Sequence, residues 1–200
     1  MSLSNVRKEL PRTLFHVAGG ISLAVLGYYL PGIWNRVVLG AILLVAVTVE
    51  AARKFSPSFN RFTQNVLGVF MRPSERDGIT GTPAYAGGVF LAFLLFPREI
   101  AVASLVPLVL GDRAAVLAGK GFGKIKIGAK TLEGSIACFA ASLAGYLVLA
   151  ELFGPFPGAG LPVLLGASLI GTMAEALPRP FDDNLTIPLA VGVFLKIATP

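Results

Sequence analysis

Seven apolar runs separated by short polar segments constrain the fold of this chain more than any other feature. They cover roughly residues 13–31, 36–52, 82–97, 99–118, 134–153, 158–177 and 185–198. A helix that crosses a membrane needs about 20 apolar residues, and 54% of this chain is hydrophobic whereas only 14% is charged. The pattern predicts an all-α, polytopic integral membrane bundle of about seven transmembrane helices, in a single domain over residues 1–200. Six helices are the alternative, because only Pro97 and Arg98 separate the third run from the fourth.

The distribution of charge predicts how this bundle is oriented. The polar segment 1–12 is not followed by a small-residue cleavage site, so we expect the first apolar run to stay in the membrane. With seven spans, the side opposite the N-terminus receives few charges: Arg36, Arg98 and Lys196 among the 17 Lys and Arg, and Glu99 and Glu151 among the 11 Asp and Glu. The positive-inside rule makes the charge-rich side cytoplasmic. Nearly every group able to do chemistry therefore gathers on the cytoplasmic face.

Several classes of protein are excluded by what the chain lacks. The single cysteine, Cys138, lies inside an apolar run, which excludes disulfides and a cysteine metal site. With one histidine and no nucleophile elbow, zinc enzymes and hydrolase triads are also excluded. No basic stripe is interleaved with aromatic residues, so we expect no nucleic-acid partner.

The segment between the second and third runs contains an amphipathic pattern. Ser56 and Pro57 have the sequence of an N-cap followed by proline at the first helical position. Apolar residues then recur at steps of three and four residues: Phe59, Phe62, Val66 and Phe70. The pattern predicts a helix that lies in the membrane interface, or one that packs on the bundle.

A carboxylate inside an apolar run is the first candidate for chemistry. Asp112 is followed by the apolar stretch 114–118, which places it about 6–10 Å inside the end of its helix. Ionisable groups at membrane depth are costly and usually functional. We expect Asp112 to bind a hard cation such as Mg²⁺, which prefers oxygen ligands. Local pairing with Arg113 is the alternative.

The glycine- and lysine-rich loop 119–131 is the second candidate. Its glycines allow backbone N–H groups to approach an anion, and its lysines add positive charge: Gly119, Lys120, Gly121, Gly123, Lys124, Lys126, Gly128 and Lys130. The loop is not a P-loop, because Ala129 separates Gly128 from Lys130 and no preceding strand is evident. The pattern predicts a phosphate-binding loop, or a basic loop that only sets topology.

Two further acidic groups flank apolar runs. Thr131 has the position of an N-cap for the following helix, and Glu133 either completes a metal site with Asp112 or only favours the helix dipole. The segment from Glu175 to Asp182, Asp183 and Asn184 either caps the last helix or converges with Asp112 on the cytoplasmic face.

Two weaker groups lie nearer the N-terminus. Arg12 and His16 are one helical turn apart, so they share a helix face; the histidine alone would also suit a structural hydrogen bond. The stretch from Arg72, Glu75 and Arg76 to Tyr85 either closes the site or caps the third transmembrane helix through Thr82 and Pro83.

Together these motifs resemble the signature of the CTP-dependent lipid-alcohol kinases, the family that contains dolichol kinase, phytol kinase and yeast-type diacylglycerol kinase. The most specific part of the resemblance is the run Gly111-Asp112-x-x-Ala115, Gly119, Gly123 and Lys130-Thr131-Leu132-Glu133-Gly134-Ser135. The less specific parts are Arg12 to His16, with Thr13 where the family has lysine, Arg76 to Tyr85, and Glu175 to Asn184. The resemblance covers most of the chain.

The resemblance implies transfer of the γ-phosphate of CTP to the hydroxyl of a lipid alcohol at a membrane, with a divalent cation such as Mg²⁺. The choice of CTP rests on the resemblance alone. It leaves open the oligomeric state and the alcohol, which is a polyprenol or dolichol, phytol, geranylgeraniol or diacylglycerol.

The residues then take distinct roles in phosphoryl transfer, which requires in-line positioning and neutralised phosphates. The expected metal ligands are Asp112 with Glu133 or Asp183. The expected triphosphate and nucleotide contacts are Lys120, Gly121, Gly123, Lys124, Lys130, Thr131, Arg76 and Asn184. The remaining carboxylate, Asp183 or Glu175, is expected to accept the hydroxyl proton, with Lys130 among the catalytic groups.

Two other functions compete with the kinase. A membrane cytidylyltransferase would use a similar site, but its usual Lys-Arg…Lys-Asp signature is not evident. A seven-helix transporter would place polar residues in mid-membrane on several helices, whereas the second, third and fifth runs have no charged residue at their centres.

Overall fold

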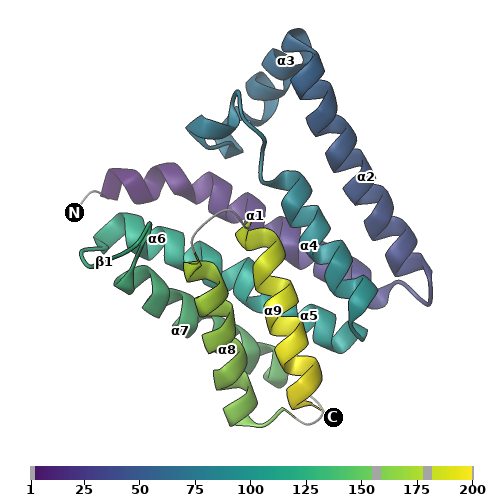
Figure 1. Cartoon of the computed structure of the whole chain (residues 1–200), viewed down its shortest axis with the longest axis vertical. Coiled ribbons are helices and arrows are strands. Elements are labelled where there is room, and N and C mark those ends of the chain that lie inside the picture. Colours follow the sequence, from purple (N-terminus) through teal and green to yellow (C-terminus); the bar gives the residue numbers. More distant parts are fainter. Residues whose placement is uncertain (1–2, 155–158, 178–181, 200) are drawn as a thin grey trace.

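The computed structural model describes residues 3–154, 159–177 and 182–199 and is built almost wholly of helices (Figure 1). In chain order these are α1 (Leu3–Tyr29), α2 (Trp34–Phe55), α3 (Pro57–Leu67), the short η1 (Gly68–Phe70) and η2 (Pro73–Glu75), α4 (Thr82–Leu95), α5 (Arg98–Val106), η3 (Pro107–Gly111), α6 (Asp112–Phe122), α7 (Leu132–Phe153), α8 (Leu161–Ala176) and α9 (Asp183–Ala198). The predicted apolar runs are mainly helical, the fourth across α5, η3 and α6 and the sixth from Leu161 onward in α8. The predicted all-α class is confirmed.

Four helical segments are long and apolar enough to cross a membrane, judged by length and composition. They are Val6–Tyr29, Trp34–Phe55, Arg98–Phe122 and Leu132–Phe153. Helices α4 and α8 are apolar but shorter. The chain is therefore a polytopic membrane protein, whereas the number of crossings beyond these four remains a prediction.

The described residues also contain one small β-hairpin, which the sequence patterns do not reveal. Strands β1 (Lys126–Ile127) and β2 (Lys130–Thr131) pair antiparallel, with Lys126 opposite Thr131. Gly128 has a φ of 60° at the first turn position, which suits a two-residue hairpin turn. Strands of two residues are too short to produce a recognisable alternation of polar and apolar side chains.

Helix α3 begins as its sequence predicts. The Ser56 hydroxyl accepts a hydrogen bond from the backbone N–H of Phe59 at 3.3 Å, and Pro57 occupies the first helical position. Phe62 and Val66 on its apolar face are 60% and 57% exposed. The bundle therefore does not cover these side chains. Their burial in the membrane interface remains a prediction.

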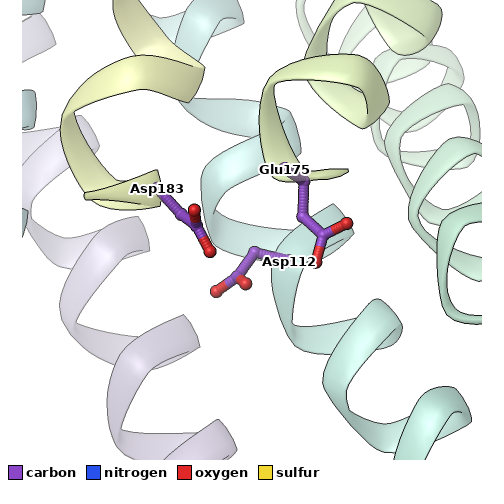
Figure 2. A group of neighbouring side chains, drawn as sticks. All are labelled: Asp112, Glu175 and Asp183. Carbon is purple, nitrogen blue, oxygen red and sulfur yellow. The ribbon is translucent and has the colours of Figure 1, made fainter. Parts of the chain in front are cut away.

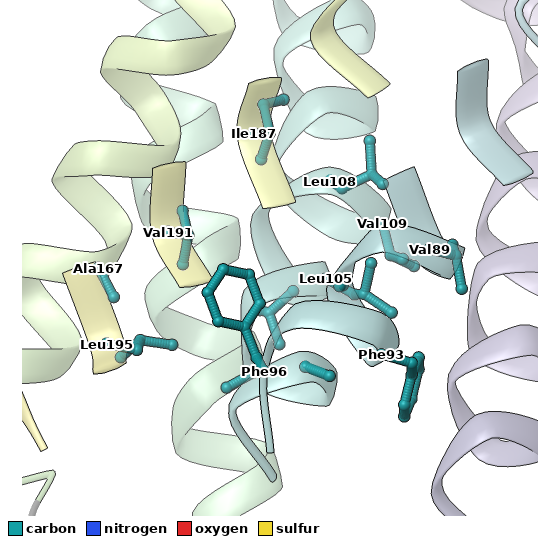
Figure 3. Packing of buried hydrophobic residues seen from close by; sticks show 14 of the residues in the cluster. Val89, Phe93, Phe96, Leu105, Leu108, Val109, Ala167, Ile187, Val191 and Leu195 are labelled. Atoms are coloured by element: carbon teal, nitrogen blue, oxygen red, sulfur yellow. The ribbon is translucent and has the colours of Figure 1, made fainter. Parts of the chain in front are cut away.

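The hydrophobic core lies where α4, the α5–η3 segment, α8 and α9 meet (Figure 3). Its buried side chains include Val89 and Phe93 of α4, Leu105 and Leu108 of the central segment, and Val191 of α9. These residues come from runs far apart in the chain. The core therefore holds together the helix ends that carry the polar residues.

A turn of π-helix, η3, joins α5 to α6 and sets the position of Asp112. Pro107 has no backbone N–H, so it interrupts the regular hydrogen-bond ladder. The amide of Asp112 donates to the carbonyl of Pro107, five residues back. Nε2 of His16 lies 3.2 Å from the carbonyl oxygen of Leu108, which ties α1 to this turn. The histidine thus makes the structural hydrogen bond that was one of its two expected roles.

Helices α4 and α9 approach closely at a glycine. A Cβ atom placed on Gly88 would lie 1.9 Å from the carbonyl oxygen of Asn184, in the first turn of α9. Small residues permit such close helix contacts in membrane proteins. The contact holds the start of α9, and with it Asp183, against the bundle.

Gly88→Ala is expected to destabilise the protein by about 1–3 kcal/mol, because the added methyl group must displace backbone atoms of α9. Gly19→Ala on α1 is the matched control, since a Cβ there meets no atom within 4 Å. Thermal unfolding in detergent measures both. An unchanged midpoint for Gly88→Ala would show that α9 can move away from Gly88 at no cost in stability.

Candidate active site

Three carboxylates from three helices converge at one end of the bundle (Figure 2). Asp112 begins α6, Glu175 lies in the last turn of α8, and Asp183 begins α9. One ligand atom from each lies within 4.8 Å of the others. Asp112 and Glu175 are only 2% and 1% exposed, whereas the Asp183 side chain is 28% exposed. Three acids this close are unfavourable unless positive charge joins them.

Lys130 supplies part of that charge. Its ammonium donates hydrogen bonds to Oε1 of Glu175 at 2.6 Å and to Oδ2 of Asp183 at 2.8 Å. Burial alone would lower the pKa of Lys130, but the hydrogen bonds and charges of the two carboxylates outweigh it and raise the pKa. The lysine is therefore charged at neutral pH and links the loop to α8 and α9.

Arg113 neutralises the third acid. Its Nε donates to Oδ2 of Asp112 at 2.9 Å, and its Nη2 contacts the same oxygen. The pairing that was the alternative role of Asp112 is thus present, while Asp112 also faces the other two carboxylates. Within the described residues, Nη1 of Arg113 and Oε2 of Glu175 are buried without a hydrogen-bond partner.

Glu133 lies in the first turn of α7, which is the position of the second of its two expected roles. It does not join the group of three acids. Its carboxylate instead accepts hydrogen bonds from the backbone N–H groups of Lys124 and Ile125, at 2.9 and 3.3 Å for Oε1. Thr131 caps α7 as predicted, accepting from the N–H of Gly134 at 3.1 Å. Both contacts hold the hairpin loop against the start of α7.

The other loop residues are distributed around this end of the bundle. Lys120 is exposed and donates to Oε1 of Glu9 at 2.6 Å, so it is already paired with an acid of α1. Lys124 is exposed, and the hairpin carries it on the surface. Gly121 and Gly123 lie at the end of α6 and are partly covered. The structure therefore brings Lys130, rather than Lys120, to the carboxylates.

The two remaining expected nucleotide contacts lie beside the start of α9 and on the loop before α4. Asn184 donates to Oδ1 of Asp182 at 2.7 Å, and Asp182 caps α9 by accepting from the Asn184 N–H. The Arg76 side chain is exposed, and its carbonyl accepts from Arg53, Asn60 and Gln64. Among the described residues, neither side chain hydrogen-bonds to any of the three acids.

A buried polar network next to the site went unrecognised in the sequence. Arg53 at the end of α2 donates to both oxygens of Glu50 and to the carbonyl of Glu75. Glu50 also accepts from the hydroxyl of Thr80 at 2.7 Å, and Glu75 accepts from the N–H of Gly81 at 3.3 Å. This network shapes the loop before α4. The stretch from Arg72 to Tyr85 was a candidate from the sequence, but the only local signal for its partners on α2 was the spacing of Glu50 and Arg53, one helical turn apart.

The donor set suits a hard divalent cation. Carboxylate oxygens are the ligands that Mg²⁺ prefers, and a buried Glu175 oxygen without a partner is available to such an ion. A cation between the acids, beside a lysine and a glycine-rich loop, is an arrangement that binds polyphosphate. The fold and the site together define a helical membrane protein with an enzyme-like acidic centre at one end.

Sequence comparisons agree with this class. Over 210 residues, which cover 96% of this chain and 94% of the relative, the chain is 32% identical to CTP-dependent diacylglycerol kinase 1 of Schizosaccharomyces pombe. It is 28% identical to the protein of the same name from Saccharomyces cerevisiae, covering 95% of this chain and 73% of the relative. No family model and no solved structure matches the chain. The chain belongs to the family of CTP-dependent lipid kinases, and the suspected resemblance is confirmed.

Proposed function

We propose that this protein transfers the γ-phosphate of CTP to the free hydroxyl of diacylglycerol, at the cytoplasmic face of a membrane and with Mg²⁺. The observation that supports it most is the convergence of Asp112, Glu175 and Asp183 around Lys130. Diacylglycerol is the first acceptor to test because the relatives named above are diacylglycerol kinases. The cytoplasmic orientation follows from the excess of Lys and Arg on that side.

The three acids divide between cation binding and proton transfer in this proposal. Asp112 and Glu175, both buried, would hold Mg²⁺, and the ion would neutralise charge on the phosphates when bound. Asp183 is the most exposed of the three, so an incoming hydroxyl reaches it most readily. Asp183 accepts the hydroxyl proton as the lipid oxygen bonds to the γ-phosphorus. The bond from that phosphorus to the β–γ bridging oxygen breaks, and CDP leaves with the electron pair.

The loop supplies positive charge and backbone donors to the nucleotide. Lys130 turns from the carboxylates toward the γ-phosphate, where it stabilises the charge that spreads over the transferred group. Lys124 and the glycine backbone approach the other phosphates. Glu133 holds the N–H groups of Lys124 and Ile125, so it keeps the loop in position.

The discriminating experiment supplies purified protein with Mg²⁺ and CTP labelled at the α- or the γ-phosphate. The acceptors are diacylglycerol, a polyprenol, phytol, geranylgeraniol and phosphatidate. Label from the γ-position in phosphatidate formed from diacylglycerol is the expected result. Label from the α-position would establish cytidylyl transfer instead. With folded protein, no transfer of either label would overturn the proposal, and γ-label in another alcohol would correct the acceptor.

Removal of divalent cations is expected to abolish transfer, because the three carboxylates would then repel the phosphates. Activity after chelation should fall below detection and return when excess Mg²⁺ is added. Thermal unfolding in detergent, recorded in parallel, separates loss of the cation from loss of the fold. Undiminished transfer in the presence of chelator would remove the cation from the mechanism.

A further inference from the structure

A long apolar groove lies between α1 and α7, with the α5–η3–α6 segment as its floor. Its volume is about 810 Å³, which is within the range of small-molecule sites in proteins. Apolar side chains from both walls and the floor line it, including Val17, Ala24, Val106, Leu110, Ala144 and Val148. Along α1 the lining residues extend from Thr13 to Tyr29, a rise of about 24 Å. The groove is therefore nearly as long as the hydrocarbon layer is thick, ~30 Å.

The groove is open along one side, where exposed apolar residues of α1 and α7 form its edges. Ile21 and Val25 on α1 are each 50% exposed, and Val148 on α7 is 56% exposed, although all three line the groove. A hydrocarbon chain in the bilayer can therefore enter from the side without crossing water.

One end of the groove is polar and adjoins the acidic centre. Thr13 and Arg113 line that end, and they are only 8% and 3% exposed. Oγ1 of Thr13 and Nη1 of Arg113 are buried and, among the described residues, have no hydrogen-bond partner. Buried donors without partners are costly and require an explanation. The other guanidinium nitrogens of Arg113 contact Asp112. Arg113 therefore lies between this end of the groove and the three acids.

We infer that this groove holds one hydrocarbon chain of the acceptor lipid and that Thr13 and Arg113 bind the ester carbonyl oxygen at its head. The inference rests on the proposed function and specifies how its site selects a glycerolipid. A carbonyl oxygen has two lone pairs, which match the two donors without partners. An isoprenoid alcohol has no carbonyl to offer them. The groove holds the tail while the hydroxyl, beyond the ester, reaches the carboxylates.

The first test compares a diester with a diether of the same chain length as acceptors. The diether lacks the carbonyl, so its KM is expected to be higher on the order of tenfold or more. Thr13→Val keeps the side-chain volume and removes the hydroxyl. It should raise the KM of the diester several-fold and leave that of the diether unchanged. A purely structural role for Thr13 would alter both equally, and equal KM values in the unaltered protein would overturn carbonyl recognition.

The second test blocks the groove from opposite walls. Ala24→Phe on α1 and Ala144→Phe on α7 should each raise the KM of long-chain diacylglycerol on the order of tenfold. The KM values of dioctanoylglycerol and CTP should stay within about twofold. Ala18→Phe is the matched control, because Ala18 is an exposed residue of α1 that does not line the groove. No change in either groove variant, or an equal change with the short-chain acceptor, would overturn the site.

A binding readout separates this inference from the proposed function. A diacylglycerol that carries a photoactivatable group near the end of one chain should label residues of α1 and α7 at the groove, with or without CTP. Labelling there in a protein that transfers no γ-phosphate would retain the lipid site and reject the kinase mechanism. Active protein labelled only on other helices would reject the groove and retain the kinase.

Discussion

Asp112→Asn is expected to lower the rate of phosphoryl transfer on the order of 1,000-fold, because the substitution removes charge from the centre of the acidic cluster. Asparagine keeps nearly the shape of aspartate but binds a divalent cation less well. One carboxylate oxygen of Asp112 lies within 4.8 Å of a carboxylate oxygen of Glu175 and of Asp183. Steady-state transfer of γ-label from CTP to diacylglycerol measures the effect. Activity close to that of the unaltered protein would remove Asp112 from the mechanism.

The fold must be checked in the same experiment, since Asp112 is also the partner of the buried Arg113. Loss of one member of a buried pair is destabilising. Asp112→Glu keeps the charge for Arg113 and moves the carboxylate by one methylene group, so it should fold and still lose activity by at least tenfold. Asp182→Asn is the matched control: Asp182 is exposed and caps α9, and asparagine is an equally good cap. It should stay within about twofold of the unaltered protein.

Lys130→Gln is expected to lower kcat/KM for CTP on the order of 100-fold. Lys130 contacts both Glu175 and Asp183, so the substitution leaves those acids without their cation and removes charge from the triphosphate site. Lys130→Arg, which keeps the charge, should retain more activity than the glutamine variant. Lys126→Gln is the matched control, because Lys126 is an exposed residue of the same hairpin.

The kinetic constants distinguish contact with CTP from support of the fold. If Lys130 binds the triphosphate, the KM for CTP rises and kcat falls while the unfolding midpoint changes little. A lower midpoint with an unchanged KM for CTP would show that Lys130 only joins the loop to α8 and α9. Equal losses in Lys130→Gln and Lys126→Gln would mean that general positive charge, rather than position, supports nucleotide binding.

Local features of this protein could be predicted from its sequence because they depend on neighbouring residues. The apolar runs became helices, since backbone groups in a membrane must be paired within the segment. Ser56 and Thr131 cap their helices as predicted, since a cap joins residues three apart. Asp112 was recognisable as a functional candidate because a charge inside an apolar run is costly.

The partners of Asp112 could not be chosen in the same way. Glu133 is nearer in the chain and was an expected metal ligand, yet its carboxylate turns to the backbone of Lys124 and Ile125. The acids that do meet Lys130 lie 45 and 53 residues further along the chain. Their approach depends on how α8 and α9 pack in the bundle. One such contact is that of Gly88 on α4 with Asn184 on α9.

The sequence by itself determined that this chain is a helical membrane protein with an acidic and basic centre, because hydropathy, charge and capping act over a few residues. Only the tertiary structure decided which acids form that centre and that a groove from Thr13 to Tyr29 leads to it. Helix packing brings together side chains from distant segments. Patterns over a few neighbouring residues do not reveal which distant segments will be in contact. The contact of Arg53 with the Glu75 carbonyl and the position of Thr13 and Arg113 at one end of the groove depend on packing in the same way.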